Sequence, residues 1–268
     1  MKKGLFLKSK EEIEQIRRSG QVLGKAHAEV AKLIGPGITT AALDKVAEEY
    51  IKDFGGTPSF KGYNGFPASL CISVNDKVVH GIPNAYALKE GDIVSIDCGV
   101  FLNGFHSDSA YTYAVGTIPA KTQKLLEVTK EALLLAIRSI VPGSRLGDVG
   151  YTVQSHAERH GFSIVRELVG HGLGRSLHES PEVPNYGKRG QGAKLDEGLV
   201  IAIEPMVNEG SRNIVQERDG WTIRTADRKP SAHFEHTVAI VEGKADVLTT
   251  FQYIEEVLKA KNGKTVIH

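Results

Sequence analysis

The alternation of apolar and polar residues predicts a hairpin in the first half of the chain. Two apolar, β-branched runs, 93–102 and 105–115, flank the pair Asn103-Gly104. Asn-Gly favours a two-residue hairpin loop because both positions of that turn need a positive φ. In this register Asp97 and Asp108 project from one face of neighbouring strands. The pair indicates either a bound cation or an exposed, hydrated face, since buried unpaired charge is very costly.

Helical periodicity precedes this hairpin. Apolar positions at helical spacing follow a capping box formed by Ser9 and Glu12, and Gly35-Pro36-Gly37 ends the run. Thr40 is the expected cap of a second helix, which ends at Gly55-Gly56. The first half therefore predicts a helix pair followed by strands.

The second half of the chain repeats this order. Two helices are predicted over about 121–140 and 146–160, and short apolar strands follow them. We interpret residues 1–268 as a single domain with an internal repeat, whose halves span about 10–118 and 119–250. The predicted class is α+β, with duplicated helix-helix-strand units.

Acidic residues recur at equivalent places in the two halves. LDEGLVIAIE matches LKEGDIVSID position by position, so Glu204 stands where Asp97 does. Glu235 opens EHTVAIV as Asp108 opens DSAYTYAV, and a His-Gly pair precedes each acidic strand. The candidate site is therefore a set of acids with one imidazole: Asp97, Asp108, His171, Glu204 and Glu235.

These residue types predict a site for two divalent metal ions. Four carboxylates in one apolar site repel one another unless positive charge compensates them. Two divalent cations carry about that charge, and oxygen ligands with one imidazole suit Co, Mn, Fe or Zn. Bridging carboxylates hold two such ions roughly 3.5–4 Å apart, with an activated water between them.

Composition narrows the class of protein. The chain has 268 residues and a formal net charge of +1, which argues against a dominant nucleic-acid or membrane role. Cys71 and Cys98 are too few for a disulfide framework and fit a reducing compartment. No apolar run is long enough for a signal peptide or a membrane span. We expect a soluble, cytoplasmic protein that binds neither DNA nor membranes.

Five motifs resemble those of the type I methionine aminopeptidases: SVNDKVVHGIPN, LKEGDIVSIDCGVFLNGFHSDSA, GHGLGRSLHE, AIEP and FEHTVAI. The resemblance covers nearly the whole chain. It implies the pita-bread fold, in which helices back a curved antiparallel sheet. It also implies a dinuclear metallopeptidase that removes the initiator methionine from peptides and nascent polypeptides when the second residue is small. We expect a monomer, and contact with the ribosome stays open.

The resemblance also implies a role for each candidate ligand. Asp97 would chelate one metal ion, and Asp108 and Glu235 would bridge both ions. His171 and Glu204 would supply the remaining protein ligands of the other ion. Glu204 would also carry a proton to the leaving amine.

Substrate-binding residues follow from the same resemblance. His80 and His178 match histidines that contact the substrate and the reacting carbonyl. An apolar pocket suits the flexible thioether of methionine. That pocket would be formed by Tyr63, Phe66, Cys71, Leu177 and Trp221, with Phe60 near its rim. We interpret His106 as a hydrogen-bonding support and not a metal ligand. His233 either supports a metal ligand from behind or is a neutral polar filler, and we favour the filler.

Three other assignments are less well supported by the sequence. X-Pro aminopeptidases and prolidases usually carry an extra N-terminal domain, whereas a helix begins here almost at once. Type II methionine aminopeptidases carry a helical insertion for which the span between His171 and Glu204 is too short. Non-catalytic peptide-binding proteins of this fold have usually lost ligands, whereas all five are present here.

Overall fold

The structure is a computed structural model that describes residues 5–263. Its helices are α1 (Lys10–Leu33), α2 (Thr40–Asp53), α3 (Ala120–Arg138), α4 (Leu146–Arg159) and α5 (Gln252–Gly263), with a short 3₁₀ helix at Tyr63–Gly65. The four helices predicted from sequence are thus present, within two residues of the expected ends. No helix in residues 5–263 combines the length and the apolar character that crossing a bilayer requires.

Short strands lie between and after the helices in both halves of the chain. The first half contains β1 (Thr57–Pro58), β2 (Leu70–Val74), β3 (Lys77–Val79), β4 (Ile93–Leu102) and β5 (Phe105–Ala114). The second half contains β6 (Ser163–Ile164), β7 (Gly170–Gly172), β8 (Glu179–Val183), β9 (Val200–Ile203), β10 (Met206–Asn208), β11 (Ile214–Gln216), β12 (Ile223–Thr225), β13 (Ser231–His233), β14 (His236–Val241) and β15 (Lys244–Val247).

Local capping explains where the first two helices begin. The predicted capping box is present, because the Glu12 amide donates to Ser9 Oγ and the Ser9 amide donates to Glu12 Oε2. The expected cap of α2 is wrong by one residue. Thr39 is the N-cap, and its hydroxyl accepts from the amide of Ala42 at 3.2 Å. Thr40 instead lies inside the helix and is buried.

The central hairpin forms in the predicted register. In β4 and β5, Gly99 lies opposite Asp108 and Asp97 lies opposite Ala110. The turn Asn103-Gly104 has φ values of 52° and 86°, as this two-residue loop requires. The alternation of side chains along the two strands therefore sets both acids on one face.

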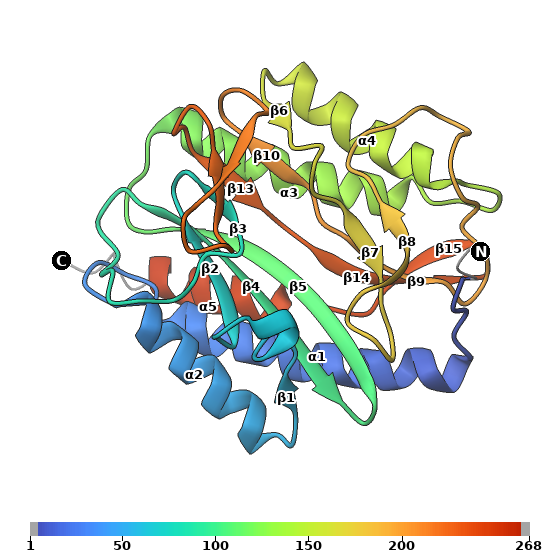
Figure 1. The fold of residues 1–268 in the computed structure, drawn as a ribbon, viewed down its shortest axis with the longest axis horizontal. Helices are drawn as coiled ribbons and strands as arrows, with labels where there is room; N and C mark the ends of the chain where they lie inside the picture. The colour runs from blue at the N-terminus through green and yellow to red at the C-terminus, as the bar shows by residue number, and fades with distance from the viewer. Residues whose placement is uncertain (1–4, 264–268) are drawn as a thin grey trace.

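Two larger sheets carry the two halves. In the first, β4 pairs with β1, β2 and β5, and in the second the order is β15-β14-β9-β7-β8. Smaller sheets join β13-β10-β6 and β11-β12-β3. In Figure 1, α1, α2 and α5 gather on one side of the strands and α3 and α4 on the other. The apolar core lies between these helices and the sheets, and it includes the buried Cys98.

Side-chain hydroxyls join the two halves where β5 and β14 run beside each other. Thr237 Oγ1 accepts from the amide of Asp108 at 3.0 Å and donates to the Asp108 carbonyl at 2.8 Å. Thr112 Oγ1 likewise accepts from the His233 amide at 2.9 Å and donates to its carbonyl at 2.7 Å. The Glu235 amide donates to the carbonyl of Ala110 at 2.9 Å. Asp108 and Glu235 therefore lie at this junction.

Candidate functional site

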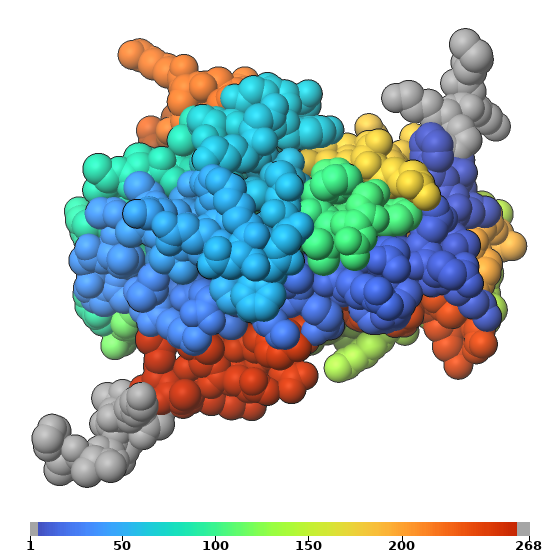
Figure 2. Space-filling model, turned by 90° about the horizontal axis from the view of Figure 1, so that it is seen from below, coloured from blue at the N-terminus to red at the C-terminus, as the bar shows by residue number. Residues whose placement is uncertain are grey.

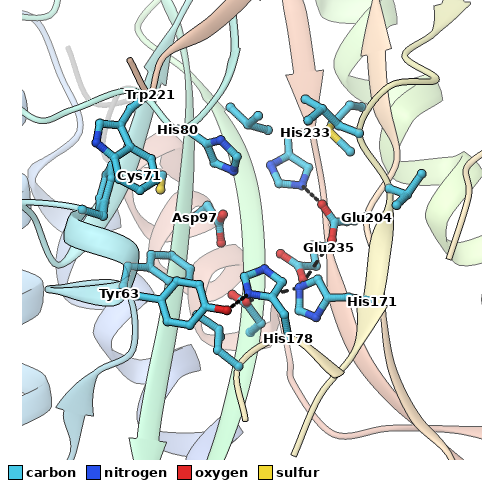
Figure 3. Close-up of a pocket in the computed structure, with 18 of the residues that line it drawn as sticks. Tyr63, Cys71, His80, Asp97, His171, His178, Glu204, Trp221, His233 and Glu235 are labelled. Atoms are coloured by element: carbon cyan, nitrogen blue, oxygen red, sulfur yellow. Dashed lines mark hydrogen bonds and ion pairs between the residues drawn. The ribbon is translucent and has the colours of Figure 1, made fainter. Parts of the chain in front are cut away.

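The five candidate ligands come from both halves of the chain and line one cavity. Asp97 is on β4, Asp108 on β5 and His171 on β7. Glu204 directly follows β9, and Glu235 directly precedes β14. Figure 3 shows four of them, Asp97, His171, Glu204 and Glu235, pointing toward one another across the cavity. The structure thus brings together the residues that the internal repeat indicated.

Distances within the group are short enough for shared binding of a cation. Ligand atoms of Asp108, His171 and Glu235 all lie within 4.8 Å of one another. His171 Nε2 is 3.7 Å from Glu204 Oε1 and 3.9 Å from Asp108 Oδ2. The other ring nitrogen, Nδ1, lies 2.9 Å from the Gly172 carbonyl. A proton on Nδ1 leaves the lone pair of Nε2 facing the carboxylates, which is the tautomer that binds metal.

Buried carboxylate oxygens show that this donor set fits a cation. Asp108 is only 3% exposed and Asp97 Oδ1 is buried, so the alternative in which these two acids lie on an exposed, hydrated face is wrong. Within the described residues, Asp97 Oδ1, Asp108 Oδ1 and Glu235 Oε1 are buried without a hydrogen-bond partner. Orphaned buried oxygens are rare and costly, and a bound ion satisfies them.

The same burial raises the pKa values of the acids. Burial raises the pKa of Asp97 to about 7. Burial and repulsion from neighbouring carboxylates raise the pKa of Asp108, Glu204 and Glu235 well above the ordinary range. Burial lowers the pKa of His171 to about 3. The protein alone therefore favours protonated acids beside a neutral imidazole, and a divalent ion would displace those protons.

Two predicted substrate contacts, His80 and His178, also line the cavity. His80 follows β3 with φ 59°, a left-handed backbone that residues other than glycine seldom adopt. Burial lowers the pKa of its ring to about 4. His178 lies at the open end, where its Nδ1 is 2.8 Å from Tyr63 Oη and its ring centroid is 4.1 Å from that of His171.

The two histidines interpreted above as supporting or filling residues, His106 and His233, differ in position. His106 is not among the residues that line the cavity, and its Nδ1 lies 2.9 Å from Ser59 Oγ, as expected of a hydrogen-bonding support. His233 does line it, with Nε2 3.7 Å from Glu204 Oε2. Neither of its ring nitrogens has a hydrogen-bond partner in the described chain. Its interpretation as a filler stays a prediction.

An apolar pocket adjoins the acids. All the predicted pocket residues line the same cavity, and four of them, Phe60, Phe66, Cys71 and Leu177, form one buried cluster. Trp221 packs against this cluster, with its ring edge-to-face to Phe66 at a centroid distance of 5.2 Å. One side of the cavity is therefore lined by the acids, and the adjoining side is an aromatic and aliphatic wall.

Sequence reasoning missed several apolar residues of the wall. Val79, Leu168 and Met206 also line the cavity. They lie at the ends of short strands or in connections, and their types do not differ from ordinary core residues. No signal in a single sequence separates such positions from the core.

Comparison with known proteins identifies the family. Residues 14–242 match the description of metallopeptidase family M24. A methionine aminopeptidase from Clostridium perfringens is 52% identical over 91% of this chain and 98% of its own length. The chain belongs to the methionine aminopeptidases of family M24. The resemblance seen in the motifs is confirmed, and membership makes the chain a metal-dependent hydrolase.

Solved structures confirm the pita-bread fold. Methionine aminopeptidase from Thermotoga maritima superposes with a TM-score of 0.91 at 44% identity, over 92% of this chain and all 100% of that one. Prolidase from Pyrococcus furiosus gives 0.75 at 25% identity, over 91% of this chain but only 65% of its own. The prolidase alternative is therefore the more distant one.

Proposed function

We propose that the chain removes the N-terminal methionine from peptides and nascent polypeptides whose second residue is small. The observation that carries the proposal is the meeting of two features in one cavity, an acid-histidine cluster and an apolar aromatic pocket. The first suits hydrolysis with divalent ions, and the second suits a thioether side chain. The names of the similar proteins point to the same activity.

Two divalent ions are proposed to bind here, with Co, Mn, Fe and Zn all acceptable to this donor set. Asp97 would chelate one ion, and Asp108 and Glu235 would bridge both. His171 and Glu204 would supply the remaining protein ligands of the other ion. The burial of unpartnered oxygens on Asp97, Asp108 and Glu235 supports this assignment. When bound, such ions act as Lewis acids and acidify a water molecule.

The chain's own side chains would orient the peptide and move protons. If Tyr63 Oη donates to Nδ1 of His178, the ring proton lies on Nε2 and can stabilise negative charge on the scissile carbonyl oxygen. Burial raises the pKa of Glu204, which suits a group that accepts a proton and passes it to the leaving amine. His80 would hydrogen-bond the scissile nitrogen as it leaves.

Selectivity would come from the pocket and its rim. The apolar cluster around Cys71 would hold the methionine side chain, and a bulky second residue would meet the rim. The chain should cleave Met-Ala-Ser in the metal-loaded state, with poor cleavage of Met-Lys-Ser and Leu-Ala-Ser. Equal turnover of all three peptides would contradict the proposal. A peptide-binding protein without catalysis would bind Met-Ala-Ser and release it intact, and a prolidase-like enzyme would prefer a dipeptide with proline second.

We further propose that the chain works as one catalytic domain and as a cytoplasmic monomer. The convergence of acids from both halves on one cavity supports a single functional unit. Both cysteines are buried and free, which fits a reducing compartment. Proximity to the ribosome would give access to new N-termini. Light scattering tests the monomer, and co-sedimentation with ribosomes tests the contact.

A further inference from the structure

A buried ion pair lies outside the acid cluster and near the cavity. Lys8 Nζ contacts the carboxylate of Glu179, and the two side chains are only 5% and 6% exposed. A buried pair of this kind is often no more stabilising than a well-packed apolar pair, because both charges lose their hydration. Its presence therefore calls for a reason beyond stability.

Glu179 closes the turn that carries two cavity residues. It directly follows Leu177 and His178, both of which line the cavity. Glu179 Oε1 accepts from the amide of Ser176 at 3.1 Å, and the Gly174 amide donates to the Ser176 carbonyl at 3.1 Å. The Glu179 carboxylate thus holds the backbone of residues 174–179 through a hydrogen bond on the buried side of the turn.

Lys8 supplies a fixed point for this turn. Its amide donates to the Gly198 carbonyl at 2.7 Å, and Nζ also donates to the Phe6 carbonyl at 2.7 Å. A Cβ on Gly174 would lie 2.3 Å from Lys8 Cε, so the lysine stem packs directly on the turn. Figure 2 shows the dark blue N-terminal segment beside the yellow residues of the second half.

The N-terminal segment also borders the route into the site. A groove that includes His171 and His178 continues along Glu179 to Phe6, which is 58% exposed. Lys8 therefore anchors both the turn with His178 and the segment that forms the outer wall of this groove.

We propose that Lys8 and Glu179 are positioning residues for catalysis. The pair holds the turn 174–179 so that His178 faces the acid cluster and Leu177 closes the apolar pocket. The proposal rests on the proposed function, in which His178 contacts the scissile carbonyl. A second ion pair on the same turn, Arg175 with Glu12 at 2.8 Å, offers a matched control. Arg175 is 68% exposed there, and exposed pairs hold geometry weakly.

The test replaces both charges together, so that neither is left buried alone. The double variant Lys8→Met/Glu179→Leu should retain the wild-type metal content and melting temperature. Its kcat for Met-Ala-Ser should fall at least about tenfold, with KM changed much less. Arg175→Ala should stay within about twofold of wild type. If that variant does not fold, Lys8→Met/Glu179→Gln keeps the shape of the Glu179 side chain, leaves no charge buried alone and gives the same comparison.

A double-mutant cycle separates positioning from general loosening. In a His178→Ala background, the Lys8/Glu179 change should have little further effect on kcat, because its target is gone. Full additivity of the two losses, or wild-type kcat in a folded double variant, would overturn the proposal. Failure of the wild-type chain to cleave Met-Ala-Ser would instead reject the proposed function, so the two failures are distinguishable.

Discussion

The two His-Gly pairs occupy equivalent places in the two halves, but the structure uses them differently. His171 lies within β7, with Nε2 3.9 Å or less from two carboxylates. His80 lies beyond the end of β3 with a left-handed backbone, and no carboxylate of the described chain forms an ion pair with it. A peptide has to approach the site from one side. This difference supports the proposal that His171 binds metal and that His80 is left free to contact the substrate.

The largest effect should come from the acids at the junction of the halves. Asp108→Asn and Glu235→Gln keep the shape of each side chain but remove negative charge from the centre of the cluster. Each should lower kcat by more than about 100-fold, because even changes behind metal ligands cost up to that much. Calorimetric titration should show weaker binding of a metal ion. Unchanged metal stoichiometry and affinity in both variants would count against a bridging role.

The two histidines should separate metal binding from catalysis. His80→Ala should lower kcat by about 100-fold, a typical loss for a group that assists proton movement, and leave metal affinity near wild type. His171→Ala should weaken metal binding itself, and added metal should restore only part of the activity. Both variants are assayed with metal titrated in parallel. Loss of a metal site in His80→Ala would show instead that both histidines bind metal.

The glycines that follow these histidines should behave alike. A Cβ on Gly81 would lie 2.1 Å from the Ile72 carbonyl oxygen, and one on Gly172 would lie 2.4 Å from that of Ser180. Each Gly→Ala change should therefore lower the free energy of unfolding by about 1–3 kcal/mol, as other overpacking changes do. Gly35→Ala is the control, since its nearest neighbour lies 4.0 Å away. If Gly81→Ala and Gly172→Ala unfold at the same urea concentration as this control, the close backbone contacts do not determine stability and the prediction is wrong.

The smallest expected effect concerns pH in the metal-free protein. Burial raises the pKa of folded Asp97 to about 7, whereas an unfolded aspartate has a pKa of about 3.9. The stability contributed by the protonated carboxyl is therefore fully present below about pH 4 and is lost as pH rises towards 7. Between pH 5 and pH 6 the titration of this group should lower the free energy of unfolding by about 1 kcal/mol. Urea unfolding with a chelator should show a flatter pH dependence in Asp97→Asn; identical slopes would contradict the expectation.

Much of the site could be predicted because its signals are local or repeated. The turn Asn103-Gly104 sets the register of β4 and β5, and the register places Asp97 and Asp108 on one face. The repeat then extends that pair to Glu204 and Glu235. These inferences need only the alternation of a strand and the matching of two short segments.

Other features depend on contacts that no local pattern contains. Lys8 and Glu179 are 171 positions apart, and nothing in either segment indicates that they meet. His80 has a left-handed backbone, and the next residue, Gly81, packs closely against the backbone of β2, which is a tertiary contact. The cap of α2 also depends on a tertiary contact. The hydroxyl of Thr40 donates to the Asn84 carbonyl at 3.0 Å, and the adjacent Thr39 caps the helix.

The most direct measurement follows bound metal and activity in the same samples. Protein stripped of metal should not cleave Met-Ala-Ser, and cleavage should rise with each addition of Co, Mn, Fe or Zn as the ions bind. Binding should saturate at two ions per chain, and Asp108→Asn should bind fewer under the same conditions. Full activity in the metal-free protein, or unchanged binding after loss of the Asp108 charge, would contradict the account.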